Sequence, residues 1–331
     1  MKVVVFGPHQ RVGALVGDQV VDLNAAAALR QQAELVPSQL QQLIEGGDRA
    51  LDAAEAAVEY ALRQAGPQAT VNAAPVLQPA SAVKLHRPQP SPATRIACAG
   101  GNYAQHTAGM GTGLAAGQRR TPEEAFQFIR QAGYWGFWKT PHVVAGPEDE
   151  VIYPARTERL DYEGEAAVVL GKPAKDVRAG QGSGYFWGVT LHFDYSIRDR
   201  RDAPMPMTFA LNKNFDTSSA LGPCIVVREL DPHDVAVQTR VNGEVRQDYN
   251  TRDMVFSFED FLEYLSRDLT LLPGDIISGG SGAGTAMDST PRGADGFIPP
   301  DRFLKVGDVV EVASPAIGVL RNRIVAKPAS T

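Results

Sequence analysis

The segment Leu160–Lys172, LDYEGEAAVVLGK, restricts the possible folds more than any other part of the chain. Glu163 and Glu165 stand two residues apart, and an apolar run over 166–170 follows directly. On an extended backbone, residues two apart point to the same face, so the segment is predicted to be a buried strand that begins with two neighbouring carboxylates. Such carboxylates repel each other unless a positive group lies between them.

Two explanations for this glutamate pair are open. A hard divalent cation takes oxygen ligands and would neutralise both carboxylates. Alternatively, the pair lies at a solvated strand end and faces water, as exposed glutamates often do. A second segment, residues 190–199 (TLHFDYSIRD), alternates apolar and polar residues around Asp194 and supplies a third acid for such a site.

These two segments and six others resemble the fumarylacetoacetate hydrolase family, in particular its bacterial two-domain members. The eight segments keep the family's order and spacing over residues 95–325. They are GNYAQH (101–106), FWK (137–139), LDYEGEAAVVLGK (160–172), FDYSIRD (193–199), LNKNFDTSSALGP (211–223), VNGEVRQDYNTRDMVFS (241–257), LLPGDIISGGSGAG (271–284) and FLKVGDVVEV (303–312). The resemblance implies that Glu163, Glu165 and Asp194 hold a metal ion, Mg²⁺ or Mn²⁺, with Ca²⁺ also possible.

The expected fold class is α+β. The resemblance implies a mixed β-roll catalytic domain, usually in a homodimer, behind a small α/β N-terminal domain. Short strands are predicted over 2–6 and 11–22, and helices over 24–35 and 48–64. Further along, a helix capped by Thr121 is predicted over 122–132, and a hairpin is predicted around Asn242–Gly243. Because residues 66–94 are rich in Pro and Ala, we predict an N-terminal domain over 1–75, a linker over 76–94 and a catalytic domain over 95–331.

Composition narrows the possible partners and compartments. The chain has 331 residues and a net charge of −6, without a basic run, which argues against a nucleic-acid surface. The only cysteines, Cys98 and Cys224, form no CxxC motif or disulfide framework, which fits a reducing cytosol. The apolar start is too short for a signal peptide or membrane span, so a cytoplasmic protein without membrane association is expected.

A glycine-punctuated segment after residue 101 is predicted to be a mobile active-site lid. Its His106 matches a family histidine that activates water, and histidine is the natural base near neutral pH. Many relatives carry a glutamate three residues later, where this chain has Gly109. A different acid must therefore orient His106, or the base or the reaction differs. Asp288 and Asp295 are candidates that the sequence does not rank.

The resemblance also implies roles for residues around the acids. Lys139 and Lys213 are expected near the metal, where they would hold an anionic substrate and stabilise developing negative charge. Residues 275–284 lack the phosphate-loop spacing and resemble a family turn that holds a substrate carboxylate. The remaining expectations are substrate contacts from Tyr103, Gly280 and Ser281, and a structural ion pair of Arg198 with Asp199 or a neighbour.

The function expected from the resemblance is metal-dependent hydrolysis of a carbon–carbon bond in a β-diketo acid, by way of an enolate held by the metal. The substrate would be like an acylpyruvate or fumarylacetoacetate, or a diketo-deoxy sugar acid. Because Gly109 replaces the lid glutamate, a 2-oxo acid decarboxylase, isomerase or hydratase with the same site is the main alternative. A non-catalytic dimeric binding protein that keeps the metal for structure is a third.

Overall fold

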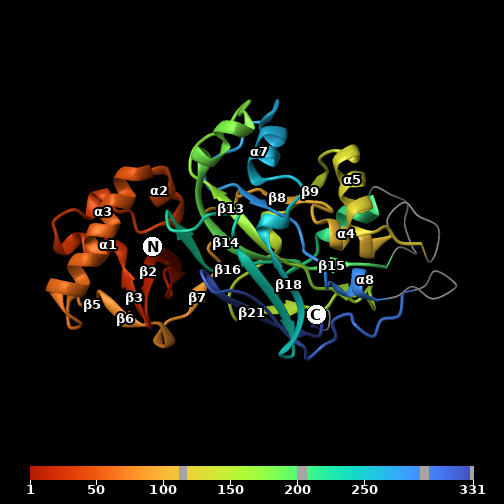
Figure 1. Cartoon of the computed structure of the whole chain (residues 1–331). Coiled ribbons are helices and arrows are strands. Elements are labelled where there is room, and N and C mark those ends of the chain that lie inside the picture. Colours follow the sequence, from red (N-terminus) through yellow and green to blue (C-terminus); the bar gives the residue numbers. More distant parts are fainter. Residues whose placement is uncertain (112–117, 200–206, 291–297, 329–331) are drawn as a thin grey trace.

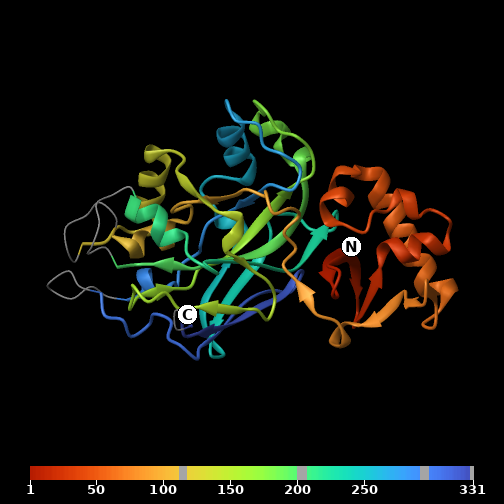
Figure 2. The same cartoon turned by 180° about the vertical axis from the view of Figure 1, so that it is seen from behind.

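The computed structural model describes residues 1–111, 118–199, 207–290 and 298–328. Within these residues, a mixed sheet of twelve strands runs through both the N-terminal and the C-terminal part of the chain. A sheet of five strands packs against it, and helices cover the N-terminal end and the opposite end (Figures 1 and 2). The predicted α+β class is confirmed.

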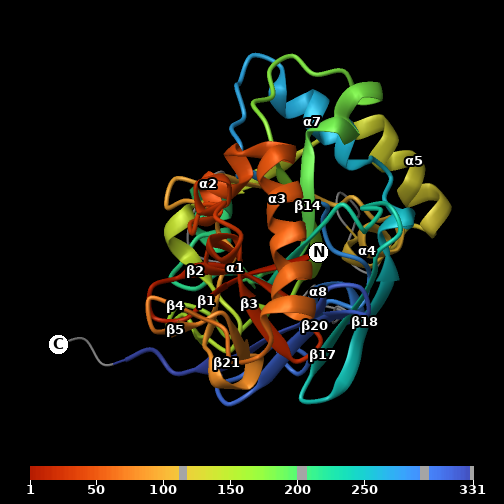
Figure 3. The same ribbon diagram turned by 90° about the vertical axis from the view of Figure 1, so that its left-hand side faces the viewer.

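The N-terminal part places three helices against a small antiparallel meander, as Figure 3 shows. The side chain of Asp22 accepts a hydrogen bond from the N–H of Ala25 and so caps the first helix. This helix ends at Leu29, earlier than predicted, because Gln31 adopts a left-handed backbone. The elements are β1 (Lys2–Phe6), β2 (Arg11–Val16), β3 (Gln19–Asp22), α1 (Leu23–Leu29), α2 (Leu40–Glu45), α3 (Gly47–Tyr60), β4 (Thr70–Val71), β5 (Ala74–Pro75) and the short turns η1 (Ala33–Leu35) and η2 (Ala61–Ala65).

The segment predicted to be a linker adds strands to this meander. β6 (Leu77–Pro79) pairs with β3, and after the turn η3 (Ala80–Ala82), β7 (Leu85–His86) pairs with β1. β1 also pairs with a strand of the C-terminal part, with Val3 opposite Ile225, so the sheet is continuous between the two parts. The division at residues 75 and 95 stays a prediction.

The apolar run after the two glutamates forms the buried strand that the sequence predicts. Ala166, Val168 and Leu170 contribute to one hydrophobic cluster, whereas Ala167 and Val169 contribute to the cluster on the opposite face. The strands of this part of the main sheet are β8 (Ile96–Ala99), β9 (Gly136–Lys139), β10 (Val144–Ala145), β13 (Gly164–Leu170), β14 (Phe186–Asp194), β16 (Ser219–Val227) and β19 (Ile276–Ser278).

The five-stranded sheet contains the predicted hairpin, in which Asn242 and Gly243 both have positive φ angles. Its strands, in spatial order, are β11 (Glu150–Ile152), β21 (Gly318–Val325), β20 (Val309–Ser314), β17 (Ala236–Val241) and β18 (Glu244–Asn250).

Short helices and one two-stranded ribbon surround the edge at which β13 begins and β14 ends (Figure 1). The predicted helix over 122–132 is confirmed, and Thr121 forms a capping box with Glu124. At this edge lie α4 (Ala104–Met110), α5 (Pro122–Ala132), α6 (Met207–Lys213), α8 (Ala286–Ser289) and the ribbon β12 (Leu160–Asp161) with β15 (Ser196–Ile197). At the opposite end, where β14 begins, α7 (Phe258–Ser266) packs against the turn η5 (Ala179–Tyr185). The remaining turns are η4 (Pro141–Val143) and η6 (Thr251–Asp253). Among the described residues, no helix is long and apolar enough to cross a bilayer.

Candidate active site

Strand pairing brings the three predicted acids to one end of the main sheet. β13 and β14 are antiparallel, with Glu165 opposite His192, so the start of β13 lies beside the end of β14. The N–H of Asp194 donates to the Glu163 carbonyl over 2.9 Å. Glu163, Glu165 and Asp194 are at most 3 % exposed and line one cavity of about 660 Å³. The solvated alternative for the glutamate pair is therefore wrong.

The charged groups that line this cavity are called the charged floor; they are His106, Glu163, Glu165, Asp194, Arg198 and Lys213.

Lys213, the last residue of α6, joins two of the acids on the charged floor. Its ammonium lies 2.7 Å from Glu163 Oε2 and 2.6 Å from Asp194 Oδ2, and it also donates to Ser196 Oγ over 2.6 Å. Burial opposes the charged form of Lys213, but the two carboxylates outweigh it and raise the lysine pKa. These contacts place Lys213 beside the acids, and its catalytic role stays a prediction.

Lys139 lies behind the charged floor rather than on it. Its ammonium is 2.5 Å from Asp194 Oδ1 and donates to the carbonyls of Ser218 and Tyr195 over 2.5 and 3.2 Å. It is 2 % exposed and is not among the residues that line the cavity. Burial lowers the pKa of Lys139. These contacts hold Asp194 in place. The position of Lys139 therefore gives no support to the direct substrate contact that the resemblance suggested.

Glu165 is held by hydroxyl groups instead of ammonium groups. Ser281 donates to its Oε1 over 2.6 Å, and Ser278 donates to its Oε2. His192, between Ser278 and Ser219, has its Nδ1 3.5 Å from Oε2. Ser281 lines the cavity as predicted, but its hydroxyl already serves Glu165.

Arg198 has different partners from the one expected. Its guanidinium pairs with Glu163 and, over 3.0 Å, with Asp161, whereas Asp199 pairs with Arg159 over 2.6 Å. Residues 198 and 199 follow an extended ribbon and so point to opposite sides. Arg198 therefore forms the predicted structural ion pair with neighbouring acids and not with Asp199, and it belongs to the charged floor.

The acid that orients His106 is Asp288. Helix α4 carries the histidine, helix α8 carries the aspartate, and Nδ1 of His106 lies 2.6 Å from Asp288 Oδ2. The opposite ring nitrogen, Nε2, lies 3.9 Å from Glu163 Oε1 on the charged floor. Burial alone would lower the pKa of His106, but the hydrogen bond and charge of Asp288 outweigh burial, so the pKa is raised. Asp295 falls outside the described residues.

Gly109 and Asp288 fit together sterically. A Cβ atom on residue 109 would lie 2.8 Å from both the Cβ and the backbone oxygen of Asp288. Any side chain at this position would therefore push α8 away from α4. The glycine that replaces the family's usual glutamate is the feature that admits an acid from the other helix.

Asp161 supports the same arrangement, although sequence reasoning missed it. It is fully buried, and it accepts hydrogen bonds from the N–H groups of Ala286 and Met287 at the start of α8 over 2.7 and 3.3 Å. Burial raises its pKa to about 6, against the opposing effect of Arg198. The alternation of acids at 161, 163 and 165 was a signal that could have found it. His192, Ser196 and Ser278 were also missed, because single serines and histidines in buried strands carry no recognisable pattern.

Two predicted substrate contacts lie outside the cavity lining. Tyr103 is buried against Tyr249, with ring centroids 4.9 Å apart, and its hydroxyl has no hydrogen-bond partner among the described residues. Gly280 has a φ angle of +89°, and a Cβ there would lie 3.0 Å from the Ala99 carbonyl. Neither residue lines the cavity, so their substrate contacts stay predictions.

The carboxylate oxygens of the charged floor suit a hard divalent cation. In the described part of the chain, no three acidic, histidine or cysteine side chains are already grouped closely enough to form a metal site. In the described part of this centre, five carboxylates stand against three lysine and arginine cations, an excess of two negative charges. Asp194 Oδ1 has the Lys139 ammonium as its single partner among the described residues. The carboxylates are Asp161, Glu163, Glu165, Asp194 and Asp288; the cations are Lys139, Arg198 and Lys213.

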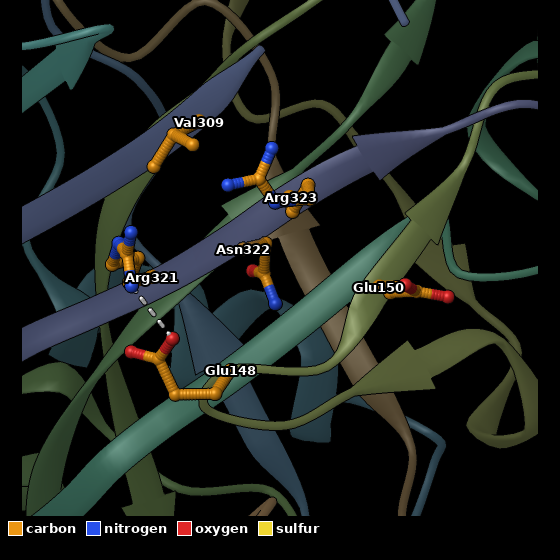
Figure 4. A pocket seen from close by; sticks show the side chains of 6 residues that line it. All are labelled: Glu148, Glu150, Val309, Arg321, Asn322 and Arg323. Carbon is orange, nitrogen blue, oxygen red and sulfur yellow. Dashed lines mark hydrogen bonds and ion pairs between the residues drawn. The ribbon is translucent and has the colours of Figure 1, made fainter. Parts of the chain in front are cut away.

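A second pocket, of about 160 Å³, lies on the five-stranded sheet away from these acids (Figure 4). Arg321 on β21 pairs with Glu148 over 3.0 Å, and Val309 and Asn322 complete part of the lining. Its charges are exposed and partly paired with each other, so its chemistry is that of a solvated surface rather than a reaction site.

The fold and site define an α+β protein with a buried acidic centre at the end of a mixed sheet. Residues 95–325 match the family model of the fumarylacetoacetate (FAA) hydrolase C-terminal domain. The chain therefore belongs to the fumarylacetoacetate hydrolase family, whose enzymes use divalent metals and include hydrolases, isomerases and tautomerases.

Individual relatives carry different activities in their names. Oxaloacetate tautomerase YisK of Bacillus subtilis is 32% identical over 317 residues, 95% of each chain. A crystal structure of 5-carboxymethyl-2-hydroxymuconate delta-isomerase from Mycobacterium smegmatis has a TM-score of 0.65 and 25% identity, and covers 99% of this chain and 100% of that one. Maleylpyruvate hydrolase from Sphingobium sp. SYK-6, in complex with manganese(II) and pyruvate, shares the fold with a TM-score of 0.70, 23% identity and the same coverage.

Proposed function

We propose that this chain catalyses the keto–enol tautomerisation of a small 2-oxo acid, with oxaloacetate as the first substrate to test. The His106–Asp288 pair carries this proposal, because it supplies one oriented proton-transfer group on the charged floor. The similarity to an oxaloacetate tautomerase over nearly the whole chain supports it. The reaction moves one proton between carbon and oxygen and requires no attacking water.

The protein groups can perform this transfer. The bond from Nδ1–H to Asp288 leaves Nε2 of His106 as the proton acceptor. Nε2 takes a proton from C3 of the keto acid, the electron pair of that C–H bond forms the C2–C3 double bond, and the carbonyl electrons move to oxygen. The cations Lys213 and Arg198 stabilise the resulting oxyanion, and Asp288 stabilises the imidazolium. The oxyanion then takes the proton back from Nε2 of the His106 imidazolium, which yields the enol and restores the neutral base.

The charged floor would hold the metal in this proposal. Glu163, Glu165 and Asp194 supply carboxylate oxygens, the donors that Mg²⁺ and Mn²⁺ prefer. A bound divalent cation supplies Lewis acidity that polarises the 2-oxo carbonyl. The small anionic substrate and a homodimeric assembly are part of the proposal.

Hydrolysis of a carbon–carbon bond in a β-diketo acid is the second candidate. The same His106–Asp288 pair could take a proton from water instead of carbon, and a structural relative is a maleylpyruvate hydrolase. Tautomerisation is preferred because the oxaloacetate tautomerase YisK is 32% identical to this chain, whereas the maleylpyruvate hydrolase is 23% identical.

The test compares both reactions on one preparation. Enol-to-keto conversion of oxaloacetate is followed by ultraviolet absorbance after dilution of the enol form, and loss of an acylpyruvate is followed in parallel, each with Mg²⁺, Mn²⁺ or a chelator. We expect acceleration of the first reaction above the buffer rate, dependent on metal, with His106→Gln lowering it by about 10²-fold or more. Cleavage of the acylpyruvate without faster tautomerisation would reject the tautomerase in favour of the hydrolase.

A further inference from the structure

The half of the cavity that faces the charged floor is almost entirely apolar. Its lining is called the apolar wall and comprises Met110, Phe128, Ile129, Trp135, Phe137 and Phe209. We infer that the apolar wall binds an aromatic or bulky apolar group at the end of the substrate remote from its carboxylate. This inference rests on the proposed function, which places the 2-oxo acid head on the charged floor.

The apolar wall begins directly beside the charged floor. The Lys213 ammonium lies over the Phe137 ring, 4.6 Å from its centroid. The Phe209 and Phe137 rings meet edge-to-face with centroids 5.4 Å apart. The Phe209 and Trp135 rings are tilted to each other with centroids 6.0 Å apart. A substrate whose anionic head reaches Lys213 would therefore direct its far end toward three aromatic rings.

The apolar wall offers little to a second carboxylate. Every charged residue on the described cavity lining belongs to the charged floor. The Arg120 guanidinium stacks on Phe128 at 4.0 Å from the ring centroid, but it is not among the lining residues. A carboxylate placed against the rings would lose hydration without a matching partner, which costs free energy. An apolar group in the same place would gain from burial.

Size and exposure point in the same direction. A cavity of about 660 Å³ is in the range that buries ligands much larger than a four-carbon diacid, roughly 300–1,000 Å³. Trp135 is 47% exposed although it lines this cavity. An apolar group of a ligand in the cavity would cover part of this exposed ring and gain free energy from the burial.

The experiment measures the ratio of kcat/KM for phenylpyruvate to kcat/KM for oxaloacetate. We expect the native enzyme to favour phenylpyruvate, and Phe209→Ala and Trp135→Ala each to lower this ratio by about tenfold, the effect typical of a lost apolar contact. Phe126→Ala is the matched control, because Phe126 is an exposed ring on the same helix as Phe128 but outside the cavity lining. It should leave the ratio unchanged.

A binding measurement separates this inference from the proposed reaction. Phenylglyoxylate keeps the 2-oxo acid head and a phenyl group but has no C3 proton, so it cannot tautomerise. Calorimetry should show that Phe209→Ala weakens the binding of phenylglyoxylate more than the binding of oxalate. This result is expected even if the enzyme turns over neither phenylpyruvate nor oxaloacetate. Equal losses for both ligands, or a native preference for oxaloacetate that the two alanine variants do not change, would overturn the apolar subsite. A change in molar mass by light scattering in Trp135→Ala would also overturn it, since the rings would then join two copies of the chain.

Discussion

The charged floor and the apolar wall face the same cavity but are constructed differently. On the charged floor, most carboxylates have two or more buried partners, and the register of β13 and β14 fixes their positions. The rings of the apolar wall come from helices, from β9 and from the residue before β9, and they contact each other through one edge-to-face pair and one tilted pair. A change that leaves a buried charge of the charged floor unpaired should therefore affect both folding and reaction, whereas a change in the apolar wall should mainly alter selectivity.

The largest expected effect comes from Asp194→Ala. This change removes the carboxylate paired with Lys139 and one of the two paired with Lys213, and an unpaired buried charge commonly costs about 3 kcal/mol or more. We expect activity to be lost and the free energy of unfolding, measured by urea titration, to fall by that amount.

Glu165→Gln is the matched control within the charged floor. Its carboxylate is held by Ser278 and Ser281, which can also donate to an amide oxygen, so the fold should be kept. Activity should still fall by a hundredfold or more, about 3 kcal/mol in transition-state terms. Retained activity in buffer with saturating metal would exclude Glu165 as a metal ligand.

The next effect concerns the pairing of α4 with α8. Asp288→Ala should lower kcat by about 10²-fold, because His106 would lose the acid that orients it. Gly109→Ala should lower kcat as well, since its Cβ would force Asp288 aside. Gly180→Ala is the control, because a Cβ at that position meets no atom within 4 Å. Normal kcat in Gly109→Ala would show that the fit between the two helices is not required.

A smaller effect is expected where the backbone supports the apolar wall. A Cβ atom on residue 100 would lie 2.5 Å from the Trp135 indole, so Gly100→Ala should displace that ring. Overpacking of this kind costs about 1 kcal/mol of stability. We expect the phenylpyruvate to oxaloacetate ratio to fall a few-fold, while metal binding measured by calorimetry stays the same. Weaker metal binding would show that the two regions are coupled.

The smallest effect lies outside both regions, at the ion pair of His233 with Glu259, whose nearest nitrogen and oxygen are 2.8 Å apart. The hydrogen bond between the two side chains raises the pKa of His233. Burial alone would raise the pKa of Glu259, but the same hydrogen bond outweighs burial and lowers that pKa. The histidine's contribution is full below its unfolded pKa and is lost as pH rises through the raised folded value. The glutamate's contribution is full above its unfolded pKa and is lost as pH falls through the lowered folded value.

The pair should therefore stabilise the fold most between the lowered pKa of Glu259 and the raised pKa of His233. Because His233 is about a third exposed, we expect about 0.5 kcal/mol. His233→Gln should remove this pH-dependent increment from the melting temperature and leave activity intact. An unchanged pH profile of stability in His233→Gln would contradict the assignment.

Local patterns in the sequence predicted much of the fold. The Asn242–Gly243 hairpin, the Thr121 cap and the buried run over 166–170 appear where they were expected, because turn chemistry, capping and strand alternation depend on neighbouring residues. The strands within the expected linker were missed because two- or three-residue strands have too few side chains to form a pattern.

By itself, the sequence determined the family, the acids at 163, 165 and 194 and the histidine that faces them, because these depend on residue type and spacing along one or two strands. Only the tertiary structure decided that Asp288 orients His106, that Arg198 pairs with Asp161 and Glu163, and that Lys139 lies behind Asp194. Each of these contacts joins residues far apart in the chain. Their meeting depends on how helices and strands pack, which no local spacing records.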